Sequence, residues 1–401
     1  MAEIKPPVET FARIKVVGVG GSGGHAISRM IDAKLKGVEF VAINTDAQDL
    51  HHNKASEKVH IGKNLTKGLG AGMNPDIGRQ AAEENRDEIQ EVLKGADMIF
   101  VTCGLGGGTG SGAAPIVAET AKELGILTVA VITKPFSFEG AQRRAIAEEA
   151  LENLRERVDT LITIPNDKLL QIIDKKTTLI NSFKIVDDVL RQGVQGISDL
   201  ITKPGIVNVD FADVKAIMSN SGSALMGIGI GVGENRSAEA AKAAISSPLL
   251  ELSIDGAKGV LFNVSGSSDL TMLEINEAAN IITESIDPNA KVIFGAVVDE
   301  TMKKGEIQIT VVATGFDADR VKESPMEKMS RITIENSRKK EETEEKPRIT
   351  FPEKFESKMI IEEKIPPKPQ RNILQTQKNK ELEDEDDELE IPAFIRRKMG
   401  K

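Results

Sequence analysis

The first part of the chain alternates short β-branched apolar runs with segments whose apolar residues recur every three or four positions. The apolar runs predict strands at Ile14–Val19, Glu39–Asn44, Met98–Cys103, Leu127–Thr133 and Leu161–Ile164. The segments between them predict helices near Gly24–Lys36, Pro75–Lys94, Ala113–Leu124 and Gln142–Arg157. Alternation of this kind predicts an α/β fold in which helices cover both faces of a parallel sheet.

A longer helical pattern extends from Thr177 to Thr202, and its apolar spacing predicts a helix that is buried around much of its circumference. Lys203, Pro204 and Gly205 end it. Four further strands are predicted, at Ser223–Gly231, Gly259–Ser265, Lys291–Val298 and Ile307–Gly315. With helices at Ser237–Ile245 and Leu273–Ser285, they predict a second, smaller α/β domain.

Composition changes at about Asp317, and Glu, Lys, Arg, Pro and Ser dominate as far as Glu388. Such a segment buries too little apolar surface to offset chain entropy, so we expect it to be disordered. A coil of about 70 residues has a root-mean-square span of roughly 45–50 Å. The last residues, 389–401, regain apolar character.

The composition restricts the setting in which the protein works. A single cysteine, Cys103, excludes an intramolecular disulfide and favours a reducing compartment. No run reaches the length of a membrane span, and Met1–Pro7 lacks the apolar stretch of a signal peptide, so we expect a soluble cytoplasmic protein. A net charge of −10 and the absence of Trp and Tyr argue against general nucleic-acid binding.

The most informative segment is Gly106–Gly112, with five glycines in seven residues between a predicted strand and a predicted helix. Such a loop can fold around a polyphosphate, and the unpaired N–H groups of the following helix point at it. A second glycine-rich turn, Gly18–Gly24, follows the first strand. Its Gly-x-Gly-x-x-Gly spacing, with Asp46 after the next strand, matches a dinucleotide-binding fingerprint.

Three interpretations of these turns are open on the residues alone: a nicotinamide or flavin oxidoreductase, another phosphate-binding site, or tight turns without a ligand. A dinucleotide site needs one glycine-rich turn, whereas this chain has two. All four histidines lie within the first sixty residues, so the second domain offers no obvious proton-transfer group. No Gly-x-x-x-x-Gly-Lys-Ser/Thr sequence occurs, which excludes an ordinary P-loop.

The ordered set of short motifs resembles the tubulin/FtsZ superfamily of GTPases, from about Arg13 to Gly315 and again at the C-terminus. Gly106–Gly112 resembles the superfamily's signature loop. The other matching segments are Gly18–Gly21, Asn44–Asp46, Gly70–Gly72, Asn74–Pro75, Pro135–Phe136, Glu139–Gly140, Arg143, Asn166, Phe183, Gln195–Gly196 and Asn208–Asp213. So many motifs in one order are specific to the superfamily.

The resemblance implies a Rossmann-like GTPase domain with a parallel sheet, a long central helix, a second smaller α/β domain and a disordered C-terminal tail. The implied divisions are a flexible arm (1–12), a GTP-binding domain (13–176), a central helix (177–202), a catalytic loop with the following helix (203–222), a C-terminal α/β domain (223–316), a disordered linker (317–388) and a terminal partner-binding peptide (389–401).

The resemblance also implies which residues bind GTP or GDP. The implied set is Gly21, Ser22, Gly23, Gly24, His25, Ala71, Gly72, Gly108, Thr109, Gly110, Glu139, Arg143, Asn166, Phe183 and Asp187. The glycines would surround the phosphates, and Ala71 and Gly72 would sense the γ-phosphate. His25 departs from the superfamily's usual Asn, and from this we expect somewhat weaker guanine binding. Ser22 is a milder variation.

Phe183 would stack on guanine, and Asp187, four residues later, would accept hydrogen bonds from its N1 and 2-amino groups. The alternative for Phe183 is ordinary core packing in an apolar helix. Glu139 and Arg143 would contact the ribose and phosphate. Their alternative is a surface ion pair with i,i+4 spacing, which contributes a few tenths of a kcal/mol.

Asn208, Asp210 and Asp213 would form the catalytic loop. Asp210 or Asp213 could also simply cap the following helix. About 25 helical residues at 1.5 Å each, nearly 40 Å, would separate these acids from the glycine-rich turns of their own subunit. The resemblance implies that subunits stack head to tail, so that this loop enters the neighbour's GTP site, where Asp210 and Asp213 position the attacking water and Mg²⁺ bridges the β- and γ-phosphates. Asp46 is a weaker candidate for the same shared site.

The terminal residues Ile391, Pro392, Phe394, Ile395 and Arg396 resemble the superfamily's C-terminal docking peptide. Ile391, Phe394 and Ile395 would share one face of a helix beginning at Pro392. The implied partners are membrane-anchored adaptors and division regulators. The alternative is a frayed terminus with chance apolar residues.

These expectations describe a cytoplasmic, GTP-dependent, self-assembling protein of the bacterial division ring, located at midcell on the inner face of the membrane. It would form a homopolymer, bind no nucleic acid and insert no segment into the membrane. The alternatives are a nicotinamide-dependent oxidoreductase and a GTP-binding scaffold that does not hydrolyse GTP. The second alternative is disfavoured because both acids, Asp210 and Asp213, are present.

Overall fold

The computed structural model describes residues 12–170, 177–203, 205–207, 209–247, 253–299 and 302–316. These residues belong to one compact unit, Met1–Ile334. Asn208, nearly all of the predicted N-terminal arm, the linker (317–388) and the terminal peptide (389–401) lie outside the described residues.

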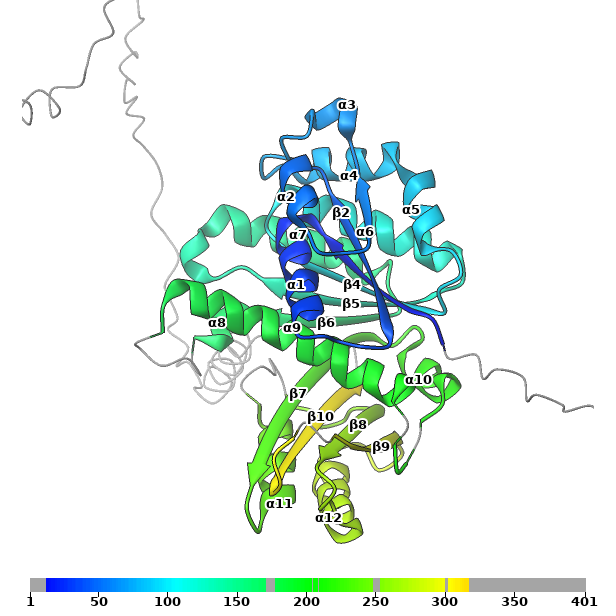
Figure 1. The fold of residues 1–401 in the computed structure, drawn as a ribbon, viewed down its shortest axis with the longest axis vertical. Coiled ribbons are helices and arrows are strands. Elements are labelled where there is room, and N and C mark those ends of the chain that lie inside the picture. The colour runs from blue at the N-terminus through cyan, green and yellow to red at the C-terminus, as the bar shows by residue number, and fades with distance from the viewer. Residues whose placement is uncertain are drawn as a thin grey trace, which may run out of the picture. The chain divides into compact units, whose positions relative to one another are not determined.

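Within the described residues, ten strands form one sheet in the order β3-β2-β1-β4-β5-β6-β7-β10-β8-β9 (Figure 1). Neighbouring strands from β3 to β7 are parallel, β10 is antiparallel to both β7 and β8, and β8 is parallel to β9. The strands are β1 (Ile14–Val19), β2 (Val38–Asn44), β3 (Glu57–His60), β4 (Met98–Gly104), β5 (Leu127–Lys134), β6 (Thr160–Pro165), β7 (Gly222–Val232), β8 (Gly259–Gly266), β9 (Lys291–Val298) and β10 (Glu306–Thr314). The predicted α/β fold with a parallel sheet is confirmed.

Helices connect most of these strands. They are α1 (Gly20–Asp32), α2 (Ala47–His52), α3 (Lys63–Thr66), α4 (Pro75–Glu84), α5 (Arg86–Leu93), α6 (Gly108–Glu123), the 3₁₀ turn η1 (Ser137–Glu139), α7 (Ala141–Arg155), α8 (Asn166–Leu169), α9 (Leu179–Thr202), α10 (Phe211–Met218), α11 (Arg236–Ile245) and α12 (Met272–Thr283). The long helix predicted from the apolar spacing is α9.

The parallel part of the sheet is buried on both faces because alternate residues of each strand enter different cores. In β1, Val16 belongs to the core that includes residues of α1 and α9, whereas Val17 belongs to the core that includes residues of α4, α5, α6 and α7. A third core joins α11 and α12 to β8, β9 and β10. The strands of the second domain therefore have their own helical cover.

The order β3-β2-β1-β4-β5-β6 reverses direction between β1 and β4. In a doubly wound sheet, ligands bind at such a reversal, just beyond the carboxyl ends of the two strands. Here β1 leads into α1 at Gly20, and β4 leads through a short loop into α6 at Gly108. The topology therefore places both glycine-rich segments at one edge of the sheet.

Several elements differ from the predicted ones. Both glycine-rich turns become helical earlier than expected: α1 begins at Gly20 and α6 at Gly108. The predicted helix Pro75–Lys94 is divided at Asn85 into α4 and α5. Strand β3 and helix α2 were not predicted, because both are short and mostly polar.

Helices α4 and α6 approach so closely that their contact admits only glycine. A Cβ atom on Gly78 would collide with the backbone carbonyl oxygen of Gly108, and a Cβ atom on Gly112 would collide with that of Pro75. This contact fixes the start of α6 against α4.

We expect the substitution Gly78→Ala to lower the free energy of unfolding by about 1–3 kcal/mol, because the added methyl group forces two helices apart. In an open helix the same change would stabilise by about 1 kcal/mol. Urea denaturation followed by circular dichroism measures the difference. Gln80→Ala, at an exposed position of the same helix, is the control. Equal or higher stability of Gly78→Ala would contradict the close packing of α4 on α6.

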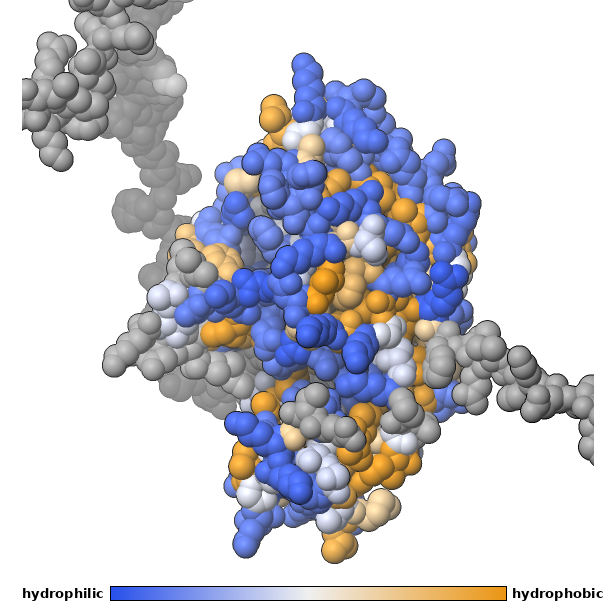
Figure 2. Space-filling view, viewed as in Figure 1, coloured by the Kyte–Doolittle hydropathy of each residue, from blue (hydrophilic) through white to orange (hydrophobic). Residues whose placement is uncertain are grey.

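Figure 2 shows that hydrophilic side chains cover much of the face in view and that apolar side chains gather there in separate groups. None of the helices in the described ranges combines the length and apolar character that crossing a membrane requires. Cys103 is fully buried in β4, and this burial raises the pKa of its thiol to about 12.

Candidate functional site

A cavity of about 800 Å³ lies beyond the carboxyl ends of β1 and β4. This volume is within the range of small-molecule sites, about 300–1,000 Å³. Its walls come from the starts of α1 and α6, the loop before α4, the η1–α7 segment and the first half of α9. The cavity therefore lies at the position that the strand order predicts for a ligand.

Two helices begin at this cavity. Gly21 and Ser22 of α1 and Gly108, Thr109 and Gly110 of α6 line it. Neither helix has an acidic residue in its first turn, and in the described residues neither N-terminus is capped by a side chain. In the same part of the chain, helices α3, α5, α7, α8 and α11 also lack a side-chain cap, so α1 and α6 are distinguished by the glycine-rich first turns that both line the cavity. Two uncapped N-termini provide N–H donors and positive dipole ends, which favour an anion such as a polyphosphate.

The two glycine-rich segments are held together by direct contacts. The hydroxyl of Ser22 accepts a hydrogen bond from the N–H of Gly104, at the end of β4, at 2.8 Å. Within the segment Gly106–Gly112, the Ser111 hydroxyl accepts one from the Gly106 N–H at 2.9 Å. Gly20 has a φ of +72°, and a Cβ atom there would lie 3.0 Å from the Gly110 nitrogen. The segments thus form one preorganised cradle.

The loop before α4 closes the cradle on one side. Gly70, Ala71 and Gly72 line the cavity, and a Cβ atom on Gly108 would lie 2.8 Å from the Ala71 Cβ atom. Asn74 then caps α4 by accepting a hydrogen bond from the Asp76 N–H at 2.9 Å. The predicted γ-phosphate-sensing residues Ala71 and Gly72 are therefore next to the start of α6.

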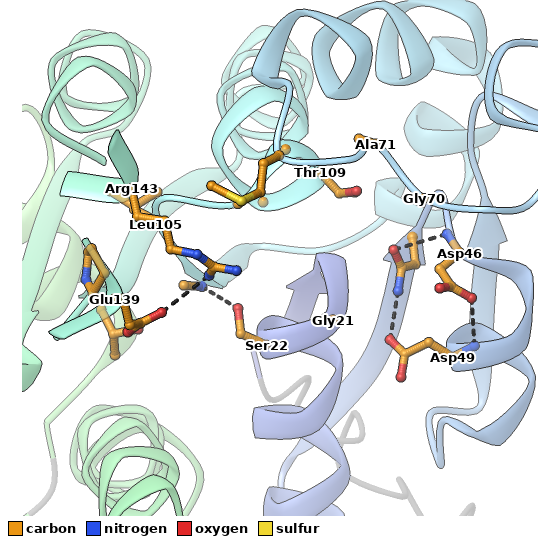
Figure 3. A pocket seen from close by; sticks show the side chains of 18 of the residues that line it. Gly21, Ser22, Asp46, Asp49, Gly70, Ala71, Leu105, Thr109, Glu139 and Arg143 are labelled. Carbon is orange, nitrogen blue, oxygen red and sulfur yellow. Dashed lines mark hydrogen bonds and ion pairs between the residues drawn. The ribbon is translucent and has the colours of Figure 1, made fainter. Parts of the chain in front are cut away.

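Glu139 and Arg143 form the opposite wall (Figure 3). They pair at 3.2 Å, and Glu139 also accepts a hydrogen bond from the Phe136 N–H at 2.8 Å. The i,i+4 ion pair that we considered as the alternative does form, and it lies in the cavity wall. Asn166 completes this side, and its Oδ1 atom is buried without a hydrogen-bond partner in the described part of the chain. An unpaired buried acceptor in a cavity wall is typical of a polar ligand site.

Phe183 and Asp187 bring α9 to the cavity. Phe183 is 40% exposed, so it is not an ordinary core residue, and its ring meets Phe136 edge-on at 5.6 Å. The Asp187 side chain is only 14% exposed and forms an ion pair with Arg29 of α1, with Nε and Oδ2 2.6 Å apart. Burial raises the pKa of Asp187 to about 6, while Arg29 and His25 act in the opposite direction.

Three residues of the predicted set do not line the cavity. Gly23 lies on the buried face of α1, where a Cβ atom would collide with the Thr102 carbonyl oxygen, and Gly24 packs beside Asn53. These two glycines allow α1 to pack closely on its neighbours. His25 is exposed and lies 3.5 Å from Asp49, in a neighbouring groove between α1 and α9.

Several cavity residues were given no role by the sequence reasoning, and Asn44 and Asp49 are the two that form a hydrogen-bonded pair. Asn44 donates a hydrogen bond to Asp49 at 2.7 Å. Asp46, a weaker candidate, also lines the cavity and caps α2 by accepting hydrogen bonds from the N–H groups of Gln48 and Asp49 (Figure 3). The position of Asn44 at the carboxyl end of β2 could have indicated it from the sequence. No sequence feature pointed to Asp49.

The predicted catalytic acids lie elsewhere. Asp210 caps α10 by accepting a hydrogen bond from the Asp213 N–H at 2.8 Å, so it has the capping role considered as an alternative. Asp213 is exposed in the first turn of α10. From Asp187 to Thr202, α9 extends by about 22 Å. The acids therefore follow the end of α9 that points away from the cavity (Figure 1).

Comparisons with known proteins agree with this geometry. Residues 13–174 match the model of the tubulin/FtsZ family GTPase domain. Residues 222–317 match the model of the FtsZ family C-terminal domain. The first range contains every cavity residue before α9, and the second contains the strands and helices of the second domain.

Solved structures give the same result. An FtsZ dimer from M. jannaschii is 49% identical over 77% of this chain and 89% of its own, with a TM-score of 0.74. CetZ2 from Haloferax volcanii, solved as a GTPγS-bound protofilament, is 21% identical over 81% of this chain and 99% of its own, with a TM-score of 0.66. At 21% identity, the similarity to CetZ2 shows a shared fold and no more. The expectation of a bacterial source is not tested by these comparisons.

Proposed function

The chain belongs to the tubulin/FtsZ family of GTPases, and from this premise we propose that it is a cell-division cytoskeletal protein that assembles head to tail. GTP would be held in the cavity of one subunit and cleaved by the acidic loop of the next. The observation that carries this proposal is the separation of the two parts: the anion cradle lies at one end of α9 and the exposed acid Asp213 follows the other.

Within the cavity, we assign the phosphates to the N–H groups at the starts of α1 and α6. We assign the ribose to the wall of Glu139, Arg143 and Asn166, and the base to Phe183 and Asp187. The carboxylate of Asp187 offers only acceptors when ionised, which suits the adjacent N1–H and 2-amino donors of guanine and repels the N1 lone pair of adenine. Gly23 and Gly24 shape the cradle without lining it.

At the contact between subunits, we infer that Asp213 orients and polarises the water that attacks the γ-phosphate. Asp210 holds the first turn of α10 and so positions Asp213. Asn208 lies outside the described residues, and its proposed contact with the nucleotide or the water rests on the family resemblance. A heterologous contact of this kind does not close on itself and therefore produces a filament.

Exposed apolar side chains in both domains support assembly. Leu69, which precedes the cavity-lining residue Gly70, is 84% exposed. Leu273, in the first turn of α12 in the second domain, is 82% exposed. The M. jannaschii relative was solved as a dimer, which is consistent with contacts between copies.

The residues of the cavity fit a Mg²⁺ ion that arrives with the nucleotide. No group of three or more His, Cys, Asp or Glu side chains in the described ranges could hold a metal by itself. Mg²⁺ in nucleotide sites is bound by phosphates with only one or two protein oxygens and several waters. The carboxylates of Asp46 and Asp49 and the hydroxyl of Thr109 would supply such oxygens, and the ion would neutralise charge that develops on the phosphates.

The remaining parts of the proposal concern the cell. We place the filament in the cytoplasm, at a midcell ring on the inner face of the membrane. The terminal peptide, which includes Ile391, Phe394 and Ile395, would bind membrane-anchored adaptors and division regulators. It lies outside the described residues, so this assignment rests on the sequence resemblance.

Phosphate release measured against protein concentration tests the shared site. We expect the GTPase rate per subunit to fall to nearly zero below a threshold concentration, because an isolated subunit lacks the acids of its neighbour. Light scattering should rise at the same threshold with GTP and remain flat with GDP. A rate per subunit that is constant down to the lowest concentration would refute the shared site while leaving GTP binding intact.

A further inference from the structure

Arg29 and Asp187 join α1 to α9 at the boundary of the nucleotide cavity. Their side chains form an ion pair with Nε and Oδ2 2.6 Å apart. Asp187 lines both the cavity and the neighbouring α1–α9 groove, whereas Arg29 lines the groove only. Arg29 therefore contacts the carboxylate of Asp187 from the groove and not from the cavity.

The Asp187 carboxylate is in an unfavourable position for a charge, since its side chain is only 14% exposed. Burial of a carboxylate favours its protonated form. Guanine recognition needs the ionised form, because a protonated carboxyl group has lost one acceptor and gained a donor. Some group must therefore keep Asp187 ionised when no base is bound.

We propose that Arg29 is a positioning residue for base recognition, which keeps the Asp187 carboxylate ionised and aimed at the cavity without touching the nucleotide itself. This inference rests on the proposed assignment of Asp187 to the guanine base. A carboxylate has about four lone-pair positions on its two oxygens, so Arg29 can hold Oδ2 while the base donates two hydrogen bonds.

The surrounding charges identify Arg29 as the main partner of Asp187. On α9, Asp188 pairs with Arg191 at 2.7 Å; on α1, Asp32 pairs with Lys54 at 2.5 Å; across the cavity, Glu139 pairs with Arg143 at 3.2 Å. Asp49 pairs with His25, and Lys184 lines the groove beside them. Of all these groups, Arg29 and then His25 lower the pKa of Asp187, which burial raises to about 6.

Protonation of Asp187 should make GTP affinity depend on pH. In wild-type protein, the ionised fraction of Asp187 falls as the pH drops through about 6, so GTP affinity should weaken on the acid side. Removing Arg29 removes a partner that lowers this pKa, so the pKa rises and affinity should already weaken at a higher pH. A displacement by one pH unit corresponds to about a tenfold change in affinity at a given acid pH.

The test is the pH profile of GTP binding between pH 5 and 8 for the full chain, measured by equilibrium dialysis below the assembly threshold. We expect Arg29→Met to bind GTP about tenfold more weakly than wild type at pH 5 and about fivefold more weakly at pH 6, but within about threefold at pH 8. Arg29→Lys retains the positive charge and should restore most of the profile. Lys184→Met, in the same groove, is the control for loss of a positive charge.

The outcomes separate this inference from the proposed function. A weakening of Arg29→Met that is equal at every pH, or a profile that superimposes on wild type, would overturn the role of Arg29. Wild-type protein that binds ATP as well as GTP at pH 8 would instead refute the assignment of Asp187 to guanine. Thermal unfolding of each variant shows whether α1 and α9 remain packed.

Discussion

Substituting Asp213 by alanine is expected to reduce GTP turnover on the order of 10³-fold while GTP binding and filament assembly persist. The side chain is exposed in the first turn of α10, after the end of α9 that points away from the cavity. Its loss therefore disturbs neither the cradle nor the core. Phosphate release and sedimentation, measured on the same sample, separate turnover from assembly.

The neighbouring acid is a poorer target for this test. Asp210 caps α10, and loss of an N-cap destabilises by about 0.5–2 kcal/mol, so its variants mix folding with chemistry. A matched control is Glu239→Ala, which removes an exposed acid from the first turn of α11. Turnover by Asp213→Ala equal to that of this control would remove Asp213 from the reaction.

The second large effect is expected from Asp187→Asn, which should exchange guanine for xanthine specificity. An asparagine amide has one acceptor and two donors, so it loses one of the two hydrogen bonds from guanine. Xanthine has a carbonyl oxygen where guanine has its 2-amino group, and it matches the amide. We expect GTP affinity to fall by about 10- to 10²-fold, since each hydrogen bond to a charged group contributes about 1.5–3 kcal/mol.

Competition between GTP and XTP for the cavity measures this exchange. Asp188→Asn is the control, because Asp188 is the next residue of α9 but lines only the groove. If Asp187→Asn kept its preference for GTP, the base would be recognised by other residues. Equal losses for both nucleotides would indicate that the ion pair with Arg29 matters for folding rather than for specificity.

The two variants together give a direct test of a site shared between subunits. Asp213→Ala binds GTP but lacks the acid, and Asp187→Asn supplies the acid but should bind XTP. The mixture is supplied with labelled GTP and unlabelled XTP. Labelled GDP should then form only where a GTP-loaded Asp213→Ala subunit contacts the loop of an Asp187→Asn subunit. Sedimentation of mixed filaments without any labelled GDP would mean that each subunit uses its own acids.

Elements with strong periodicity could be predicted from the sequence. The bounds of β1 and β9 agree with the prediction, and α9 begins within two residues of the predicted start. The beginnings of α1 and α6 could not be predicted in this way, because glycine is a poor helix former and the apolar pattern begins only after the glycines. There the close approach of α4 to α6, rather than helix propensity, selects Gly112.

The residues of the site likewise include some that the sequence indicated and some that it did not. The glycine-rich turns and the family motifs indicated most of the residues that line the cavity, including Thr109 and Asn166. The pairing of Arg29 with Asp187 links two helices that are distant in sequence, and no local pattern announces it. The sequence allowed either Asp210 or Asp213 as a cap of the following helix, and only the folded backbone, in which Asp210 accepts from the Asp213 N–H, identifies Asp210.

The burial of Cys103 has a practical consequence. Thiol reagents act on the thiolate, and a sulfhydryl group enclosed in β4 with so high a pKa is both inaccessible and protonated at neutral pH. The chain has no other cysteine. A cysteine engineered at an exposed position such as Leu69 would therefore be the single maleimide-reactive group in native protein. Cross-linking from that position would report directly which surface of the adjoining subunit it touches.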